Sequence, residues 1–433
     1  ITSGALQLHA DAIGQDNEGG GDLSGGDATG GTIHLFANGG GKIQVNGDVD
    51  ASADGVGGSM MDGATHGGTG QGGTIAAKPS GTDSSIHVTG DFFASSSGSG
   101  GSYVGEGVPT LATGGDGRGG FAYFQLAGGS LTIGGDLSLE AEGTGGNGRD
   151  GGQAFGGNVG LFGAGGSANL GPDIFLTASA FGGDASNGFG GNGGFAKGGV
   201  AYIQADATLA SGETPAVQST VTGGTADLEV EAWGGHGGAG NGSDIAAGRG
   251  GDGQGGVYNG NVASGGAFTI ANTAGGTLTL GDVFLYSGGF GGDGGDGGTG
   301  QAGGAGGTAF GGLSQAGTYN PLNASAANAS FGNVFLDSSA QGGNGGLGDQ
   351  GHGAAADGTG GDAKAGGTYT CVANNPGTCG GSVLNARGTV NVAGIASLIS
   401  QAVAGGGSAG GNALGGFAAI HSLPNASLHI AGG

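Results

Sequence analysis

Aspartate repeatedly follows a Gly-Gly pair, and carboxylates in this repeated setting are the first residues of the chain that could do chemistry. If successive repeats stack, these side chains would lie above one another, and stacked carboxylate and carbonyl oxygens can bind Ca²⁺. The calcium candidates on this reasoning are Asp252, Asp293 and Asp296. The favoured alternative is that these Asp residues lie at exposed turns, where their charge keeps the protein soluble. Aspartates in this setting include Asp27, Asp116, Asp184, Asp252, Asp293, Asp296 and Asp362.

Two other polar patterns could belong to a catalytic site. Gly351-His352-Gly353 resembles the GHG element of β-helical polygalacturonases, but the NTD, DD and RIK elements of that family are missing. Glu140/Glu142 and Glu229/Glu231 could form acid/base pairs. Their i, i+2 spacing on strands instead predicts that both members face solvent or a neighbouring layer. No HExxH motif or His/Cys cluster supports a zinc site. We therefore predict that the chain is not an enzyme.

The only cysteines are Cys371 and Cys379, in the sequence CVANNPGTC. An Asn-Pro-Gly turn lies between them, so a disulfide that closes this small loop is the preferred interpretation. Two free buried thiols are the alternative.

Residues 281–300, GDVFLYSGGFGGDGGDGGTG, show the two sequence periods from which the chain is built. The first part alternates in twos, which is typical of a β-strand. From Gly288 a variable residue follows each Gly-Gly pair, and a three-residue period fits an extended left-handed helix of the polyproline II type. Built from glycine, such a helix keeps its N–H donors and can approach its neighbours closely.

A strand of the form G-D-apolar-x-apolar, called here the marker strand, recurs eight times at spacings of 37 to 62 residues, for example GDVDASA at Gly47 and ADLEVEA at Ala226. Aligned copies place apolar side chains in ladders, which predicts the interior of a stacked parallel coil. The predicted ladder includes Val49, Leu137, Ile174, Leu228, Val283 and Val334.

Further short strands precede each marker strand, such as TIHLFA at Thr32 and KIQVN at Lys42. We predict an all-β fold: a right-handed parallel β-solenoid of about nine to ten turns, with three strands per turn and a side layer of polyglycine II legs. Residues 1–433 would form one repeat domain, with wider turns from about residue 200. The aromatic residues where legs begin, Phe181, Trp233 and Phe290, are expected to plug the junction between core and leg.

Composition narrows the possible partners. Glycine makes up 124 of 433 residues, but only 7 prolines are present, which excludes collagen. The formal net charge is −25, from 8 basic and 33 acidic residues. Nucleic acid and anionic membranes are therefore not expected as partners, because both require clustered Lys and Arg. No run of eighteen apolar residues predicts a membrane span. The ends, Ile1 and Ala431-Gly-Gly, suggest a processed subunit or an excerpt of a longer polypeptide.

With its marker strands, Gly-Gly corners and unequal repeats, the chain resembles the glycine-rich repeat regions of large secreted bacterial exoproteins, such as filamentous-haemagglutinin-type adhesins and autotransporter passengers. The resemblance covers nearly the whole chain and rests on pattern. It implies a right-handed parallel β-helix displayed outside a bacterial cell. The long GGX legs look more like the polyglycine II bundles of some phage fibre tips and of a glycine-rich insect antifreeze protein.

From these features we expect an extracellular structural or adhesive protein that forms or extends a surface fibre. Its partners would be other copies, end to end or side by side, and cell-surface glycans. No cofactor is expected except calcium. The alternatives are a β-helical carbohydrate-active enzyme and an ice- or surface-binding protein, for which the only hint is TLTL at Thr277.

Overall fold

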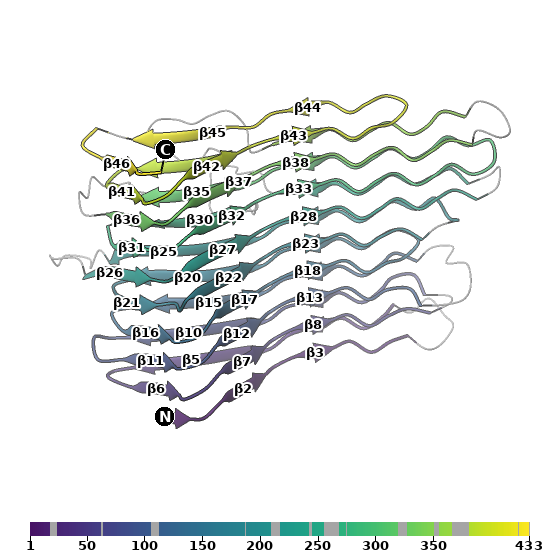
Figure 1. Ribbon diagram of the computed structural model, residues 1–433. Coiled ribbons are helices and arrows are strands. Elements are labelled where there is room, and N and C mark those ends of the chain that lie inside the picture. The colour runs from purple at the N-terminus through teal and green to yellow at the C-terminus, as the bar shows by residue number, and fades with distance from the viewer. Residues whose placement is uncertain are drawn as a thin grey trace.

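A computed structural model describes residues 1–17, 24–61, 64–104, 112–186, 188–208, 217–241, 245–254, 268–273, 275–318, 327–349, 355–365, 381–422 and 424–432. Over these residues the chain is all β without a helix, as predicted, and its strands stack in parallel from coil to coil. Figure 1 shows the stack rising from the N-terminus at the bottom to the C-terminus at the top. The three main strands of each coil lie on the left, and extended segments reach to the right.

Each coil begins with its longest strand, which forms the first sheet. Alternate residues point into the core: Ile33, Ile75 and Ala122 lie in register, and all three are buried. This alternation of apolar and polar residues explains why the segment pairs as a strand. The strands are β5 (Thr32–Asn38), β10 (Thr74–Ser80), β15 (Phe121–Leu126), β20 (Asn158–Ala164), β25 (Val200–Thr208), β30 (Phe268–Thr273), β35 (Leu313–Thr318), β40 (Gly381–Ala386) and β45 (Ala418–Ser422).

The second strand of each coil is shorter and closes another wall of the core. Its interior positions include Ile43, Ile86 and Leu131, which lie directly above one another. One antiparallel pairing, between Ala207–Thr208 and Val217–Gln218, joins the first two sheets. The strands are β1 (Thr2–Ser3), β6 (Lys42–Val45), β11 (Ser85–Val88), β16 (Ser130–Ile133), β21 (Gly166–Asn169), β26 (Val217–Thr222), β31 (Thr277–Thr279), β36 (Asn328–Phe331), β41 (Thr389–Val392) and β46 (Ser427–Ile430).

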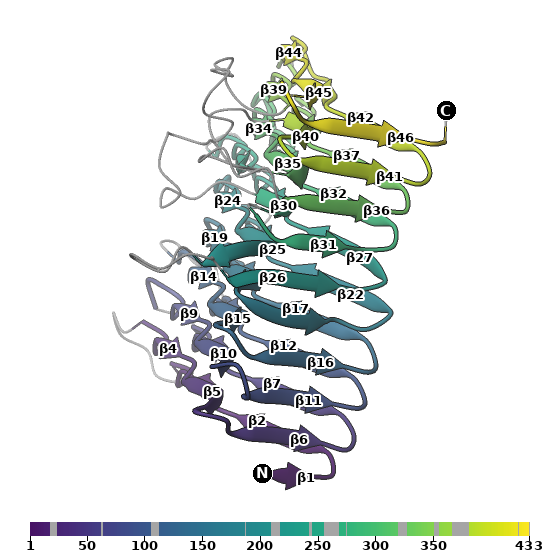
Figure 2. The same cartoon turned by 90° about the vertical axis from the view of Figure 1, so that its left-hand side faces the viewer.

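The marker strands form the third sheet, which has nine strands. Figure 2 shows the molecule from the side of the three main strands, with the marker strands stacked beside those of the second sheet. The strands are β2 (Leu6–His9), β7 (Val49–Ser52), β12 (Phe92–Ser95), β17 (Leu137–Glu140), β22 (Asp173–Thr177), β27 (Thr225–Glu229), β32 (Val283–Tyr286), β37 (Val334–Asp337) and β42 (Ala396–Ile399).

The six predicted ladder residues all lie in the main apolar core, each at 1% exposure or less. The predicted alignment is wrong in one repeat. Ala226, not Leu228, pairs with Ile174 and Val283, and Leu228 pairs with Leu176 and Leu285. Thr225 therefore takes the place that Asp holds in most of the other copies, such as Asp173 and Asp282. A two-residue slip keeps every side chain on the same face, so the alternation of residues could not reveal it.

Each coil contains five strands and not the predicted three. The two additional strands are short and lie where the segment between consecutive coils leaves the core and returns to it; we call these places the leg roots. We call the segment that leaves the marker strand the outgoing leg and the segment that comes back the return leg. The outgoing legs stack through β3 (Ala12–Ile13), β8 (Gly55–Val56), β13 (Gly98–Ser99), β18 (Gly143–Thr144), β23 (Ala180–Phe181), β28 (Ala232–Trp233), β33 (Gly289–Phe290), β38 (Ala340–Gln341) and β43 (Ala402–Val403).

The return legs form a second stack beside the first. Figure 1 shows both stacks extending away from the core along the whole length of the molecule. Their strands are β4 (Ala28–Thr29), β9 (Gly70–Gln71), β14 (Gly117–Arg118), β19 (Ala154–Phe155), β24 (Ala196–Lys197), β29 (Gly253–Gln254), β34 (Ala309–Phe310), β39 (Ala363–Lys364) and β44 (Ala413–Leu414).

Candidate functional site

The two leg stacks form a slab whose interior is filled mostly by the smallest side chains. At the leg roots the inward positions are Gly or Ala; Ala154, Ala180, Ala196 and Ala232, for example, pack together with no exposed surface. The next residue in each strand points outward. At the leg roots a Cβ is the largest group that lies between the layers. Further out the inward positions are mostly glycine, with one exception in the first coils, where Met60 is buried against Ala64 and Ala112.

Glycine is required because the backbones of the two layers bond to each other directly. The Gly235 N–H donates to the Gly194 carbonyl at 2.9 Å, and the Gly251 N–H donates to the Gly235 carbonyl at 2.7 Å. A Cβ on Gly235 would collide with the carbonyl oxygen of Gly183. Such bonds alternate between return and outgoing legs without a break through Gly26, Gly58, Gly68, Gly101, Gly115, Gly146, Gly152, Gly183, Gly194, Gly235, Gly251, Gly292, Gly307, Gly343, Gly361, Gly405 and Gly411.

A second alternating chain of bonds lies three residues further out, through Gly191, Gly238, Gly248, Gly295, Gly304, Gly346 and Gly358. Within one layer the bonds have the same spacing: Gly234, Gly237 and Gly240 donate to Phe290, Asp293 and Asp296 of the next outgoing leg. Each GGX triplet thus sends one donor to the next leg of its own layer and one donor to the other layer.

The Asp and Asn side chains at the X positions bond to the backbone of the next coil. Asp184 Oδ1 accepts the His236 N–H at 2.8 Å, and Asp293 Oδ1 accepts the Asn344 N–H at 2.6 Å. On the return legs, Asp252 Oδ1 accepts the Thr308 N–H at 2.7 Å. These carboxylates therefore satisfy backbone N–H donors of the next coil.

The three calcium candidates are not brought together as a group. Asp293 and Asp296 lie on an outgoing leg, where each accepts a backbone N–H from residues 344 and 347, whereas Asp252 lies on a return leg. Asp252 also pairs with the Arg249 guanidinium. Among the described residues, no group of three or more His, Cys, Asp or Glu side chains could hold a metal ion.

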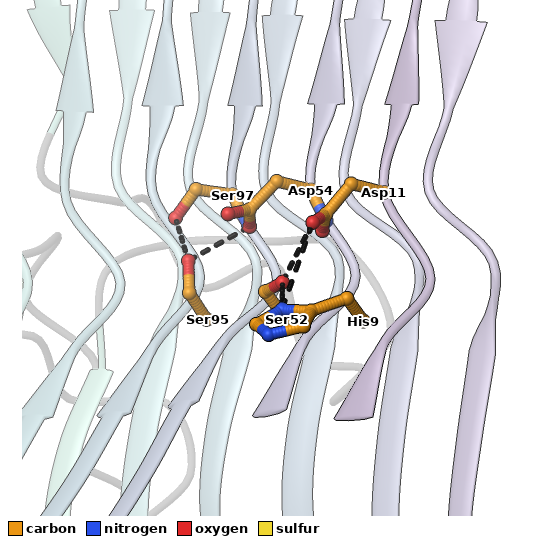
Figure 3. Close-up of polar contacts among 6 residues, drawn as sticks. All are labelled: His9, Asp11, Ser52, Asp54, Ser95 and Ser97. Carbon is orange, nitrogen blue, oxygen red and sulfur yellow. Dashed lines mark hydrogen bonds and ion pairs between the residues drawn. The ribbon is translucent and has the colours of Figure 1, made fainter. Parts of the chain in front are cut away.

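A cluster of His9, Ser52 and Asp11 lies where the first marker strands bend into their legs (Figure 3). Ser52 Oγ donates to Asp11 Oδ2 at 2.7 Å and lies 2.7 Å from His9 Nδ1. Serine stands between the other two residues, whereas a nucleophilic triad needs histidine in the middle to take the serine proton. The hydroxyl proton already points to the carboxylate. The arrangement therefore does not activate Ser52 as a nucleophile.

The same position recurs in the next coil, where Asp54 Oδ1 accepts the Ser97 N–H at 2.6 Å and the Ser95 hydroxyl at 2.7 Å (Figure 3). This cluster is not evident from the sequence, because the hydrogen-bond partners from neighbouring coils lie 41 to 43 residues apart in the chain. An Asp two positions after each of the first two marker strands, Asp11 and Asp54, was the available signal.

Glu140, Glu142, Glu229 and Glu231 form what we call the carboxylate corner, on the outer face of the third sheet where strands bend into outgoing legs. Glu140 and Glu229 occupy one register column, with Thr177 between them. Burial and repulsion from Glu140 and Glu229 raise the pKa of Glu142 from 4.5 to about 7. Burial also raises the pKa of Glu140, Glu229 and Glu231. The glutamates face outward as predicted, but they are half-buried and affect one another.

The aromatic residues at the leg roots do not plug the junction, contrary to the prediction. Trp233 is 42% exposed on the outer face and stacks on Phe290 at 3.8 Å between ring centroids. Its Nε1 donates to Glu231 Oε2 at 3.0 Å. Alanine and glycine fill the junction instead, because the two layers are too close for a ring.

Two predicted features lie outside the described residues: the Cys371–Cys379 disulfide and the Gly351-His352-Gly353 element. No described helix has the length and apolar character that crossing a membrane requires. Comparisons of the chain with protein-family models, with curated proteins and with solved structures give no match.

Proposed function

We propose that this chain is a structural segment of an extracellular fibre, displayed on a bacterial surface and serving adhesion or matrix formation. The observation that carries the proposal is the unbroken chain of glycine hydrogen bonds from Gly26 to Gly411. It ties every coil to the next outside the apolar core, so the rod has two parallel sets of cross-connections. The described residues pack into a regular rod and not around a cleft that holds a reactive group.

The legs in this proposal are polyglycine II helices attached to a right-handed solenoid. The three-residue spacing of donors along the legs and their two directions of bonding support this assignment. Neighbouring copies would associate end to end or side by side, and cell-surface glycans are the expected adhesion partners. The cell-surface location and the bacterial source rest on the resemblance described above.

Electron microscopy and small-angle scattering of the purified chain test the structural role. We expect rigid rods that associate into fibres or sheets as the protein concentration rises. At roughly 4.8 Å per coil, nine coils give a core about 45 Å long, which sets the dimension to be compared. A compact, concentration-independent particle of different dimensions would contradict the proposal. Binding to immobilised cell-surface glycans tests the adhesive role separately.

The carboxylate corner favours a second candidate function, that of a carbohydrate-active enzyme. A glutamate whose pKa is near 7 can act as a general acid beside an ionised carboxylate. Depolymerase assays on acidic polysaccharides, with Glu142→Gln as the comparison, test this candidate. Activity that the substitution abolishes would replace the structural proposal.

A further inference from the structure

The two leg stacks differ in where their basic side chains lie. No Lys or Arg occurs in the marker strands or along the outgoing legs, which contain many acidic residues; Arg149 stands at the turn between Gly148 of an outgoing leg and Asp150 of a return leg. The return legs carry Arg118, Lys197, Arg249 and Lys364, and they also carry aspartates, among them Asp27, Asp116, Asp252 and Asp362. We call the outward side chains of the return legs the return-leg face. Because the layers meet through Gly and Ala, this face points away from the carboxylate corner.

Two cations on the return-leg face share one register column. Arg118 pairs with Phe155, and Phe155 pairs with Lys197, so the cations lie two coils apart. The Arg118 side chain is 49% exposed and Lys197 is half-buried. Arg118 packs over the Phe155 ring at 5.0 Å and pairs with Asp116 at 3.2 Å. These contacts hold its guanidinium at the surface.

The carboxylate corner repeats at the same interval. Glu140 and Glu229 also lie two coils apart, each with a second glutamate two residues further along. At roughly 4.8 Å per coil, both intervals are about 10 Å. The glutamates repel one another, and no cation in the described part of their own chain forms an ion pair with them.

We propose that a second copy of this chain lies alongside the first, parallel to it, with Arg118 and Lys197 of one copy against the glutamates of the carboxylate corner of the other. This inference rests on the proposed structural role and names its lateral contact. Charge complementarity and the equal two-coil spacing select this partner. The contact joins different faces of the two copies, so each copy still has one free face of each kind. Further copies can therefore add on both sides, and the assembly extends into a sheet of parallel rods.

Sedimentation velocity and electron microscopy over a range of concentrations, on a charge-swap pair, test the proposal. The first variant carries Arg118→Glu with Lys197→Glu, and the second carries Glu142→Lys with Glu229→Lys. We expect the unmodified chain to form lateral sheets and each variant alone to lose them, because like charges then face each other. An equimolar mixture should restore the sheets, since each reversed face meets its complement. Lys42→Glu with Lys78→Glu makes the same charge change away from the legs and should leave assembly unchanged.

Thermal melting and scattering of each variant separate loss of contact from loss of fold. Sheets that survive in either variant alone, or a mixture of folded variants that stays unassembled, would overturn the proposal. So would an unmodified chain that stays single at all concentrations, and if that chain is still a rod, the structural role survives without this contact. If a reversal unfolds the chain, Arg118→Gln with Lys197→Gln replaces it and is expected to weaken assembly at least tenfold.

Discussion

The N–H of Gly235 on an outgoing leg donates to the carbonyl oxygen of Gly194 on the preceding return leg, at 2.9 Å. This bond joins two segments that side-chain patterning cannot align, because neither residue has a side chain. It is one link in the chain of bonds that runs through all coils. The glycine content of the sequence is therefore a packing requirement of the slab.

Gly235→Ala should destabilise the chain strongly. Its methyl group would meet the Gly183 carbonyl oxygen, which is backbone and cannot rotate away. Overpacking usually costs about 1–3 kcal/mol, and we expect the upper end of that range or more. Gly415→Ala is the matched control, because nothing lies within 4 Å of a Cβ there. The free energy of unfolding from denaturant titration measures both, and equal effects would remove the requirement for glycine in the slab.

The register around Ala226 can be tested with paired cysteines, in a chain in which Cys371 and Cys379 are replaced by serine. Ala226→Cys with Val283→Cys should form a disulfide on oxidation, since these residues are direct partners. Leu228→Cys with Val283→Cys should not, because a two-residue offset moves the sulfurs apart. Peptide mass mapping distinguishes the pairs. Cross-linking of the second pair alone would support the register that the sequence alignment predicts.

The sequence predicts the core well because apolar residues alternate there: Val283 and Leu285 point inward, as the period of two requires. It predicts the legs only in outline, since polyglycine carries no pattern that says which glycine bonds to which. The exposed position of Trp233 could not be foreseen, because it follows from the narrow gap between the layers. The role of Asp293 as a backbone acceptor depends on the neighbouring coil and is equally invisible in the sequence.

Substitutions of Asp293 test whether the carboxylates on the legs bind calcium or accept backbone hydrogen bonds. Asp293→Asn keeps an oxygen that can accept the Asn344 N–H, so its melting temperature should match that of the unmodified chain. Asp293→Ala removes the acceptor and should lower stability by up to about 1 kcal/mol. Thermal melting with calcium or with a chelator completes the test. If calcium raises the melting temperature and Asp293→Asn abolishes that effect, the carboxylate binds the metal.

Stability should rise as the pH falls through neutrality, because of the carboxylate corner. The pKa of Glu142 is about 7 in the folded chain and 4.5 ordinarily, so between these values the folded state holds a proton that the unfolded state has lost. The free energy of unfolding should therefore increase from pH 8 to pH 5 and then level off near 4.5. Partial exposure limits the contribution of Glu142 to roughly 1–2 kcal/mol.

Glu142→Gln should raise stability at pH 8, leave it nearly unchanged near pH 4.5 and flatten the slope between them, because the neutral amide mimics the protonated acid. Asp48→Asn, at an exposed position outside the corner, controls for the loss of one negative charge. Urea titrations at pH 5, 6, 7 and 8 give the slopes. If stability depends on pH equally in Glu142→Gln and in the unmodified chain, Glu142 ionises in the folded state as it does in the unfolded one. The glutamates of the corner would then not repel one another, and a cation from a neighbouring copy would gain nothing by binding there.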